Sequence, residues 1–160
     1  MNSLSSPLAP NRRRRQSVCH HCITLKVQEI PLLVAVAGPT GSGKSALALH
    51  LAHRLNGEIL NCDSVQVYRY FNIGTAKLPE SEREGIPHHL IDALDPDQVF
   101  TAGDFSRQGR ELLRQIASRG RTPIVCGGTG FYLRALIDGL APGPQRDDDL
   151  RQRLTARETR

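Results

Sequence analysis

Residues 38–45 read GPTGSGKS and directly follow the apolar run LLVAVA at residues 32–37. This is the G-x-x-x-x-G-K-[ST] pattern of a phosphate-binding loop, in the position between a strand and a helix that the pattern requires. Glycines let the backbone wrap around a phosphate with several N–H groups pointing inward, and the helix adds the positive end of its dipole. Lys44 supplies a point charge for the outer phosphate, and the hydroxyl of Ser45 can ligate Mg²⁺. The predicted phosphate cradle consists of Gly38, Pro39, Thr40, Gly41, Ser42, Gly43, Lys44 and Ser45.

The charge of the chain is concentrated near its start. The 160 residues carry a net charge of +5, but residues 1–30 hold five basic residues against one acidic residue, so the remainder is nearly neutral. Bulk charge therefore gives no argument for nucleic-acid binding. With no Trp, three Tyr and four Phe, the composition indicates no aromatic platform for stacked bases. No apolar run approaches the length of a membrane span, so we expect no membrane association.

Residues 1–30 are predicted to form a separate, disordered basic extension, because they are rich in Ser, Pro and Arg and lack periodicity. Such a segment fits an organellar transit peptide, an RNA-contacting arm or a tail outside the fold. Cys19 and Cys22 resemble half of a zinc knuckle, but no second pair follows at a suitable spacing. Cys62 and Cys126 lie in or beside apolar runs, which favours a reducing, cytoplasmic location.

From residue 31 onward, strand and helix patterns alternate. A helix with one apolar stripe should follow the loop and end near Gly57. A second helix should begin at Thr101, with Asp104 completing a capping box, and end at Gly120. A third should cover residues 131–137. Strands are predicted at residues 32–37, 58–62, 89–91 and 123–126. The predicted buried helix positions are Leu47, Ala48, Leu51, Ala52 and Leu55, then Phe105, Gly109, Leu112, Leu113 and Ile116.

This alternation predicts an α/β fold of the P-loop NTPase-like kind, a mostly parallel sheet flanked by helices. The P-loop domain should span residues 31–145. Residues 146–160 should begin a helical region with Leu150 and Leu154 on one face. Because that pattern stops without a cap, we expect the chain to be the first part of a longer protein.

Three elements should meet at one edge of the sheet. The P-loop, Asp63 and the Gly127–Gly130 turn each follow a predicted strand, and ligands of open α/β sheets bind beyond the carboxyl ends of the strands. The strand at 123–126 ends in Gly-Gly-Thr rather than in the Asp that holds Mg²⁺ in ATP-driven machines, and Asp92 is a weak substitute. The pattern therefore favours a transferase in which Asp63 handles an acceptor group.

Five blocks then carry a specific resemblance. They are GPTGSGKS at 38–45, DSVQVY at 63–68, IGTAK at 73–77, AGDF at 102–105 and GGTGFY at 127–132. In content, order and spacing they resemble the tRNA dimethylallyltransferase family over about residues 32–157. The resemblance implies transfer of a dimethylallyl group from dimethylallyl diphosphate to the exocyclic N6 amine of an adenosine adjacent to the anticodon in tRNA. The partners would be dimethylallyl diphosphate and the tRNA anticodon stem-loop, and the cofactor Mg²⁺.

The resemblance also implies roles for individual residues. The loop from Gly38 to Ser45 would hold the donor's diphosphate, with Thr40 near the bridging oxygen, Lys44 stabilising the departing charge and Ser45 on Mg²⁺. Asp63 would be the base toward the adenine amine. Contacts with tRNA are expected from Asp63, Ser64, Val65, Gln66, Thr129 and Arg151.

Other readings stay open at this point. Family members are longer, with a further helical region that grips tRNA, so these 160 residues would lack part of the machinery. An isopentenyltransferase acting on free adenine nucleotides would have a similar site. A small-molecule P-loop kinase explains the P-loop but not the block at 127–132. A truncated RNA-binding protein without catalysis is a third possibility. We expect a monomer.

Overall fold

The computed structural model describes residues 22–27, 30–140 and 148–158. Within these ranges the strands are β1 (Cys22–Val27), β2 (Ile30–Ala37), β3 (Gly57–Asn61), β4 (His88–His89) and β5 (Thr122–Gly127). The helices are α1 (Lys44–Leu55), α2 (Ala102–Ser118), α3 (Gly130–Asp138) and α4 (Asp148–Glu158), with a 3₁₀ turn at Glu80–Glu82. The strands form one sheet in the order β1-β2-β5-β3-β4. β1 runs antiparallel to β2 and the other pairs are parallel, so the predicted mostly parallel α/β fold is confirmed.

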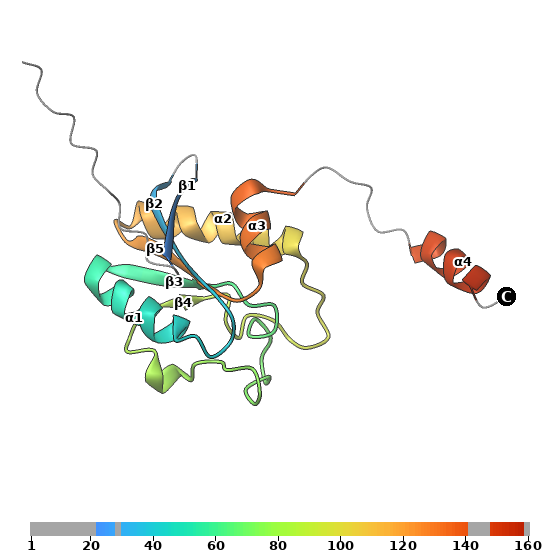
Figure 1. The fold of residues 1–160 in the computed structure, drawn as a ribbon, viewed down its shortest axis with the longest axis horizontal. Coiled ribbons are helices and arrows are strands. Elements are labelled where there is room, and N and C mark those ends of the chain that lie inside the picture. Colours follow the sequence, from blue (N-terminus) through green and yellow to red (C-terminus); the bar gives the residue numbers. More distant parts are fainter. Residues whose placement is uncertain (1–21, 28–29, 141–147, 159–160) are drawn as a thin grey trace, which may run out of the picture.

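Both faces of the sheet are covered. Figure 1 shows α1 on one face and α2 with α3 on the other. This is why the central strands are continuous apolar runs, since a parallel strand covered on both faces has no side facing water. The core on the α1 face consists of Val34, Val36, Ala48, Leu49, Ala52, Ile59 and Ile124. The core on the other face consists of Leu33, Leu60, Cys62, Ala102, Phe105, Leu113, Val125, Tyr132, Ala135 and Leu136.

The ends of α2 follow the sequence prediction. Thr101 is the N-cap, and its hydroxyl accepts a hydrogen bond from the backbone N–H of Asp104 while the Asp104 carboxylate accepts from that of Thr101. The side-chain and backbone hydrogen bonds with Thr101 lower the pKa of Asp104. Gly120 follows the helix with φ of 71°, the left-handed conformation that ends many helices. At Gly109 a Cβ would lie 2.9 Å from Leu136, so glycine permits the close packing of α2 on α3.

The prediction for α1 is wrong in two details. The sequence predicts that Gly57 ends the helix, but the left-handed C-cap is Asn56, with φ of 50°. Gly57 instead begins β3, where a Cβ would lie 2.8 Å from the carbonyl oxygen of Thr122. Leu49 is buried and Leu55 is 38% exposed, because the helix turns the face around Ala48 toward the sheet.

An ion pair ties the sheet to Arg119, the half-exposed C-cap of α2. Glu58 on β3 is 6% exposed, and its carboxylate accepts hydrogen bonds from Arg119 at 2.8 Å and contacts the ring of His89 at 2.7 Å. Burial by itself would raise the pKa of Glu58, but the bonds with Arg119 and His89 lower it overall. The two-residue strand β4 is therefore held by side chains as well as by its pairing with β3.

The expectation of disorder throughout residues 1–30 is wrong for β1. Five residue pairs align β1 with β2, from Cys22 opposite Val36 to Val27 opposite Ile30. The signal was present in the sequence, because Ile23, Leu25 and Val27 alternate with more polar residues in the period of a strand. The basic composition of the preceding residues masked it. Cys19 and the expected boundary between residues 145 and 146 lie outside the described residues.

Deleting residues 1–27 should destabilise the domain, whereas deleting residues 1–21 leaves both strands and is the matched control. The longer deletion removes the backbone hydrogen bonds that β1 makes with β2, a loss of roughly 2 kcal/mol or more. It should lower the melting temperature by about 5 °C relative to the control. The exposed edge of β2 should also promote self-association, measurable by light scattering. Equal melting temperatures for the two deletions would contradict the pairing.

Candidate active site

Three strand ends meet at one cavity. β2 leads into the P-loop, β3 leads to Asp63, and β5 leads to Gly127 and Gly128. Between them lies a cavity of about 240 Å³. It is lined by Thr40, Gly41, Gly43, Lys44, Ser45, Ala46, Ala48, Ile59, Asn61, Asp63, Gln66, Thr75, Ala76, Leu78, His88, Ile91, Cys126, Gly127 and Gly128. The structure thus brings together most of the predicted phosphate cradle with Asp63 and Gln66.

The P-loop has the backbone of an anion site. Gly41 and Gly43 have φ of 80° and 78°, so both adopt the left-handed conformation that glycine alone takes without strain. Gly43 is the N-cap of α1 and has no side chain to occupy the first N–H groups of the helix. The ammonium of Lys44 donates to the carbonyl oxygen of Pro39 at 2.5 Å, which uses one of its three donors. Ser45 is exposed at the first turn of α1.

Asp63 shapes its own turn and also lines the cavity. Its Oδ1 accepts hydrogen bonds from the backbone N–H groups of Val65 at 2.9 Å and Gln66 at 3.2 Å. These bonds fix the carboxylate at the strand end in the manner of an Asx turn. A carboxylate has a second oxygen, so the turn leaves Asp63 able to accept a further hydrogen bond or a proton.

The Gly-rich turn after β5 lies against the chain after β3. At Gly127 a Cβ would lie 2.1 Å from the carbonyl oxygen of Cys62, a contact that excludes any other residue. The N–H of Thr129 bonds to the same carbonyl at 3.2 Å, and its hydroxyl accepts from the N–H of Ser64 at 3.0 Å. Ser64 and Thr129 therefore contact each other, and their contact with tRNA stays a prediction. The contact of Arg151 with tRNA also stays a prediction, and this residue is exposed on α4.

The rest of the cavity wall was missed from the sequence. Ile59, Leu78 and Ile91 give it an apolar part. His88 lies beside them, and its Nδ1 is 2.8 Å from the carbonyl oxygen of Ile86. A carbonyl only accepts, so Nδ1 carries the proton and Nε2 is the acceptor of the neutral ring. Burial is the main cause of the lowered pKa of His88, which favours the neutral form of the ring.

The two cysteines of this region are poor nucleophiles. Burial raises the pKa of Cys62 to about 12 and that of Cys126 to about 11. Cys126 lines the cavity, but its thiol is protonated at neutral pH. The raised pKa values give no support for covalent catalysis by a thiolate at this site.

Asp92 does not substitute for a magnesium-binding aspartate. Its Oδ1 lies 2.7 Å from the ammonium of Lys77, and its Oδ2 lies 3.2 Å from the guanidinium of Arg83. Burial favours a higher pKa for Asp92, but these two cations lower it overall. The carboxylate is thus engaged within the protein, a pairing that the short sequence pattern could not reveal.

The donor set suits a magnesium ion that arrives with a phosphate ligand. Ser45 and Asp63 line the same cavity and offer a hydroxyl and a carboxylate oxygen. The described residues contain no group of three His, Cys, Asp or Glu side chains arranged for a metal. Mg²⁺ is commonly held by one or two protein oxygens together with substrate phosphates, so this sparse set fits it.

A family model described as IPP transferase matches residues 66–160. The chain belongs to the IPP transferase family. This IPP transferase chain is 67% identical over 128 residues to a tRNA dimethylallyltransferase of Solibacter usitatus, covering 80% of the chain and 42% of that protein. It is 59% identical to one from Koribacter versatilis, with the same coverage. The chain spans about two fifths of the length of these curated relatives.

Solved structures agree with this placement. The full-length tRNA isopentenylpyrophosphate transferase of Bacillus halodurans is 47% identical, with a TM-score of 0.67 over 78% of this IPP transferase chain and 41% of that one. A eukaryotic dimethylallyltransferase, crystallised acting on tRNA, is 37% identical, with a TM-score of 0.65 over 73% of this chain and 30% of that one. Among the residues that our structure describes, no helix is long and apolar enough to cross a membrane.

Substituting Gly127 with alanine should destabilise the domain by about 3 kcal/mol or more, at the upper end of overpacking costs, because the new Cβ would collide with backbone. Gly130→Ala is the matched control, since a Cβ there has no heavy atom within 4 Å and alanine favours the start of α3. Urea unfolding monitored by circular dichroism measures both. If Gly127→Ala unfolds at the same urea concentration as the control, the close approach of β3 and β5 is wrong.

Proposed function

We propose that this chain carries the diphosphate cradle and the catalytic base of a tRNA dimethylallyltransferase. The reaction would transfer the dimethylallyl group of dimethylallyl diphosphate to the N6 amine of an adenosine adjacent to the anticodon. The observation that carries the proposal is a single cavity that joins the P-loop to Asp63. In this proposal the leaving diphosphate would lie against the P-loop, Asp63 would take the proton of the nucleophile, and the reacting carbon would lie between them.

The residues support a direct displacement. The N6 nitrogen would form a bond to C1 of the dimethylallyl group while the bond from C1 to the bridging oxygen breaks and its electron pair leaves with diphosphate. The N–H groups of the P-loop and the ammonium of Lys44 would stabilise the charge that grows on the leaving group. Thr40 also lines the cavity and would lie near the bridging oxygen. Asp63 would accept the proton that N6 loses.

Ser45 would hold Mg²⁺ together with the diphosphate, and that cation would supply further charge neutralisation to the leaving group. Binding of the target base requires the nucleotide to leave its stack, because a stacked base cannot reach the end of a cavity. Gln66 lines the same cavity as Asp63 and would contact that base.

Two observations favour this reaction over a P-loop kinase. The strand that ends beside the P-loop continues as Gly127-Gly128 rather than as an aspartate, and Asp92 is engaged with Lys77 and Arg83. The named functions of the relatives favour tRNA over free adenine nucleotides as the acceptor.

The chain should bind dimethylallyl diphosphate in the presence of Mg²⁺ and show no preference for a purine base. The reason is that a P-loop recognises phosphate oxygens, and none of its residues addresses a base. Calorimetry on the chain should compare dimethylallyl diphosphate, inorganic diphosphate and ATP. Transfer of label from the donor to bulk tRNA gives the reaction itself. Tight binding of ATP without binding of the prenyl diphosphate would overturn the proposal and favour the kinase.

Asp63→Asn should lower the rate of prenyl transfer by roughly 10²–10⁴ while leaving the donor's dissociation constant nearly unchanged. Asparagine keeps the side-chain oxygen that the turn needs but cannot take a proton. Single-turnover transfer at saturating tRNA and donor measures the chemical step. Asp97→Asn, at an exposed position, is the matched control. An unchanged chemical step would show that Asp63 only holds its turn, and a large loss of donor affinity would show that it acts through Mg²⁺.

A further inference from the structure

The loop between Tyr68 and Lys77 borders the cavity, yet apolar packing does not explain its order. Tyr70 is 76% exposed and Ile73 is 96% exposed, and Phe71, whose ring lies 6.0 Å from that of Tyr68, is still 43% exposed. Tyr70 and Ala76 also have φ of 66° and 52°, a left-handed conformation that is unfavourable for residues with a Cβ. An exposed and strained segment of this kind needs another source of order.

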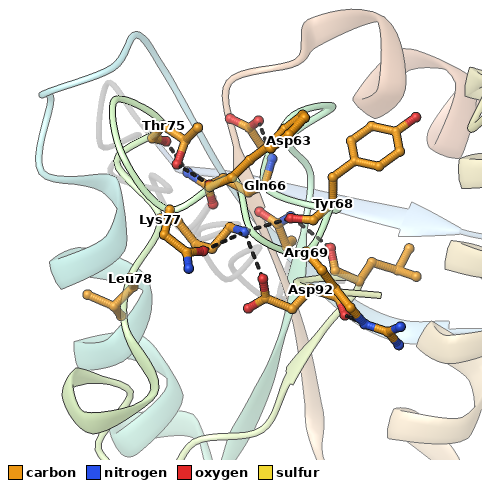
Figure 2. A network of polar contacts seen from close by, with 12 residues as sticks. Asp63, Gln66, Tyr68, Arg69, Thr75, Lys77, Leu78 and Asp92 are labelled. Carbon is orange, nitrogen blue, oxygen red and sulfur yellow. Dashed lines mark hydrogen bonds and ion pairs between the residues drawn. The ribbon is translucent and has the colours of Figure 1, made fainter. Parts of the chain in front are cut away.

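Lys77 supplies that order through a buried ammonium. Its side chain is 4% exposed, and its Nζ donates to the carbonyl oxygen of Tyr68 at 2.7 Å, to Asn72 Oδ1 at 3.1 Å and to Asp92 Oδ1 at 2.7 Å. Figure 2 shows these bonds converging on the ammonium between the two arms of the loop. An ammonium has three donors, so this set satisfies all of them and Lys77 has none left for a phosphate.

The neighbouring bonds extend the same arrangement to the cavity wall. The Nε2 of Gln66 donates to the carbonyl oxygen of Thr75 at 2.9 Å. This bond joins the two ends of the loop, and both residues line the cavity. The hydroxyl of Thr75 donates to the carbonyl oxygen of Phe71 at 2.8 Å. The backbone N–H of Asp92 bonds to the carbonyl oxygen of Gln66 at 3.2 Å. The base of the loop and the side chain of Gln66 are therefore fixed by polar contacts that surround Lys77.

We propose that Lys77 is a positioning residue for the acceptor side of the cavity. Its ammonium closes the loop between Tyr68 and itself and thereby holds Gln66 and Thr75 at the wall. The proposal rests on the proposed function, because it takes the wall formed by Gln66 and Thr75 as the part that contacts the acceptor base. The P-loop is held separately, between β2 and α1, so the two sides of the cavity respond differently when Lys77 is replaced.

Lys77→Met is the informative variant, because Asp92 keeps its bond to Arg83 and no buried charge is left alone. Amide hydrogen exchange should accelerate at least tenfold in residues 66–76 and remain unchanged in α1. Inorganic diphosphate with Mg²⁺ should bind within twofold of the wild-type affinity. The KM for tRNA should rise at least tenfold, with a smaller change in kcat.

Arg69→Met is the matched control from the same loop. Its guanidinium bonds to the carbonyl oxygen of Asp92 and to the Asp95 carboxylate but is about half exposed, so its loss should have little effect. Lys77→Arg, which keeps the charge, should fall between wild type and Lys77→Met. Unchanged exchange in residues 66–76 would overturn the proposal, as would a loss of diphosphate affinity equal to the loss for tRNA. Wild-type protein that binds no dimethylallyl diphosphate in the presence of Mg²⁺ would refute the proposed function, while the exchange measurement would still decide the role of Lys77 in ordering the loop.

Discussion

The site depends on a backbone contact between the ends of β3 and β5. The N–H of Cys62 bonds to the carbonyl oxygen of Cys126 at 2.8 Å, and Gly127 passes so close to Cys62 that no side chain fits between them. This contact sets the separation between the turn that carries Asp63 and the Gly-rich turn. Because β5 also pairs with β2, it fixes the P-loop relative to both turns. One narrow contact thus determines how the P-loop, Asp63 and the Gly-rich turn are arranged around the cavity.

The features that the sequence predicted correctly have local causes. The P-loop, the capping box of α2 and the left-handed Gly120 each depend on residues within a few positions of one another. The convergence of three strand ends also followed from the sequence, because parallel strands present their carboxyl ends at one edge. Local pattern and general topology were therefore sufficient for the fold and for the position of the P-loop at the cavity.

The features that sequence reasoning missed depend on partners far apart in the chain. Asp92 could be taken for a metal ligand until Lys77, fifteen residues away, was seen to pair with it. The strand expected at residues 89–91 is β4, but its bounds are His88–His89, and it is held in part by Glu58, 31 residues from His89. β1 had a strand pattern, but the composition around it pointed to disorder. In these cases, the deciding energy comes from tertiary contacts rather than from propensity.

The order of the strands also limits when this domain can acquire its structure during synthesis. β2 and β3 are made early but do not pair with each other, since β5 lies between them and comes about sixty residues after β3. While the ribosome makes the chain from the N-terminus, the P-loop sequence emerges long before the strand that orders its sheet. The hairpin of β1 and β2 is the exception, because its strands are adjacent in sequence. β1 therefore covers one edge of β2 before β5, the partner of the other edge, has been synthesised.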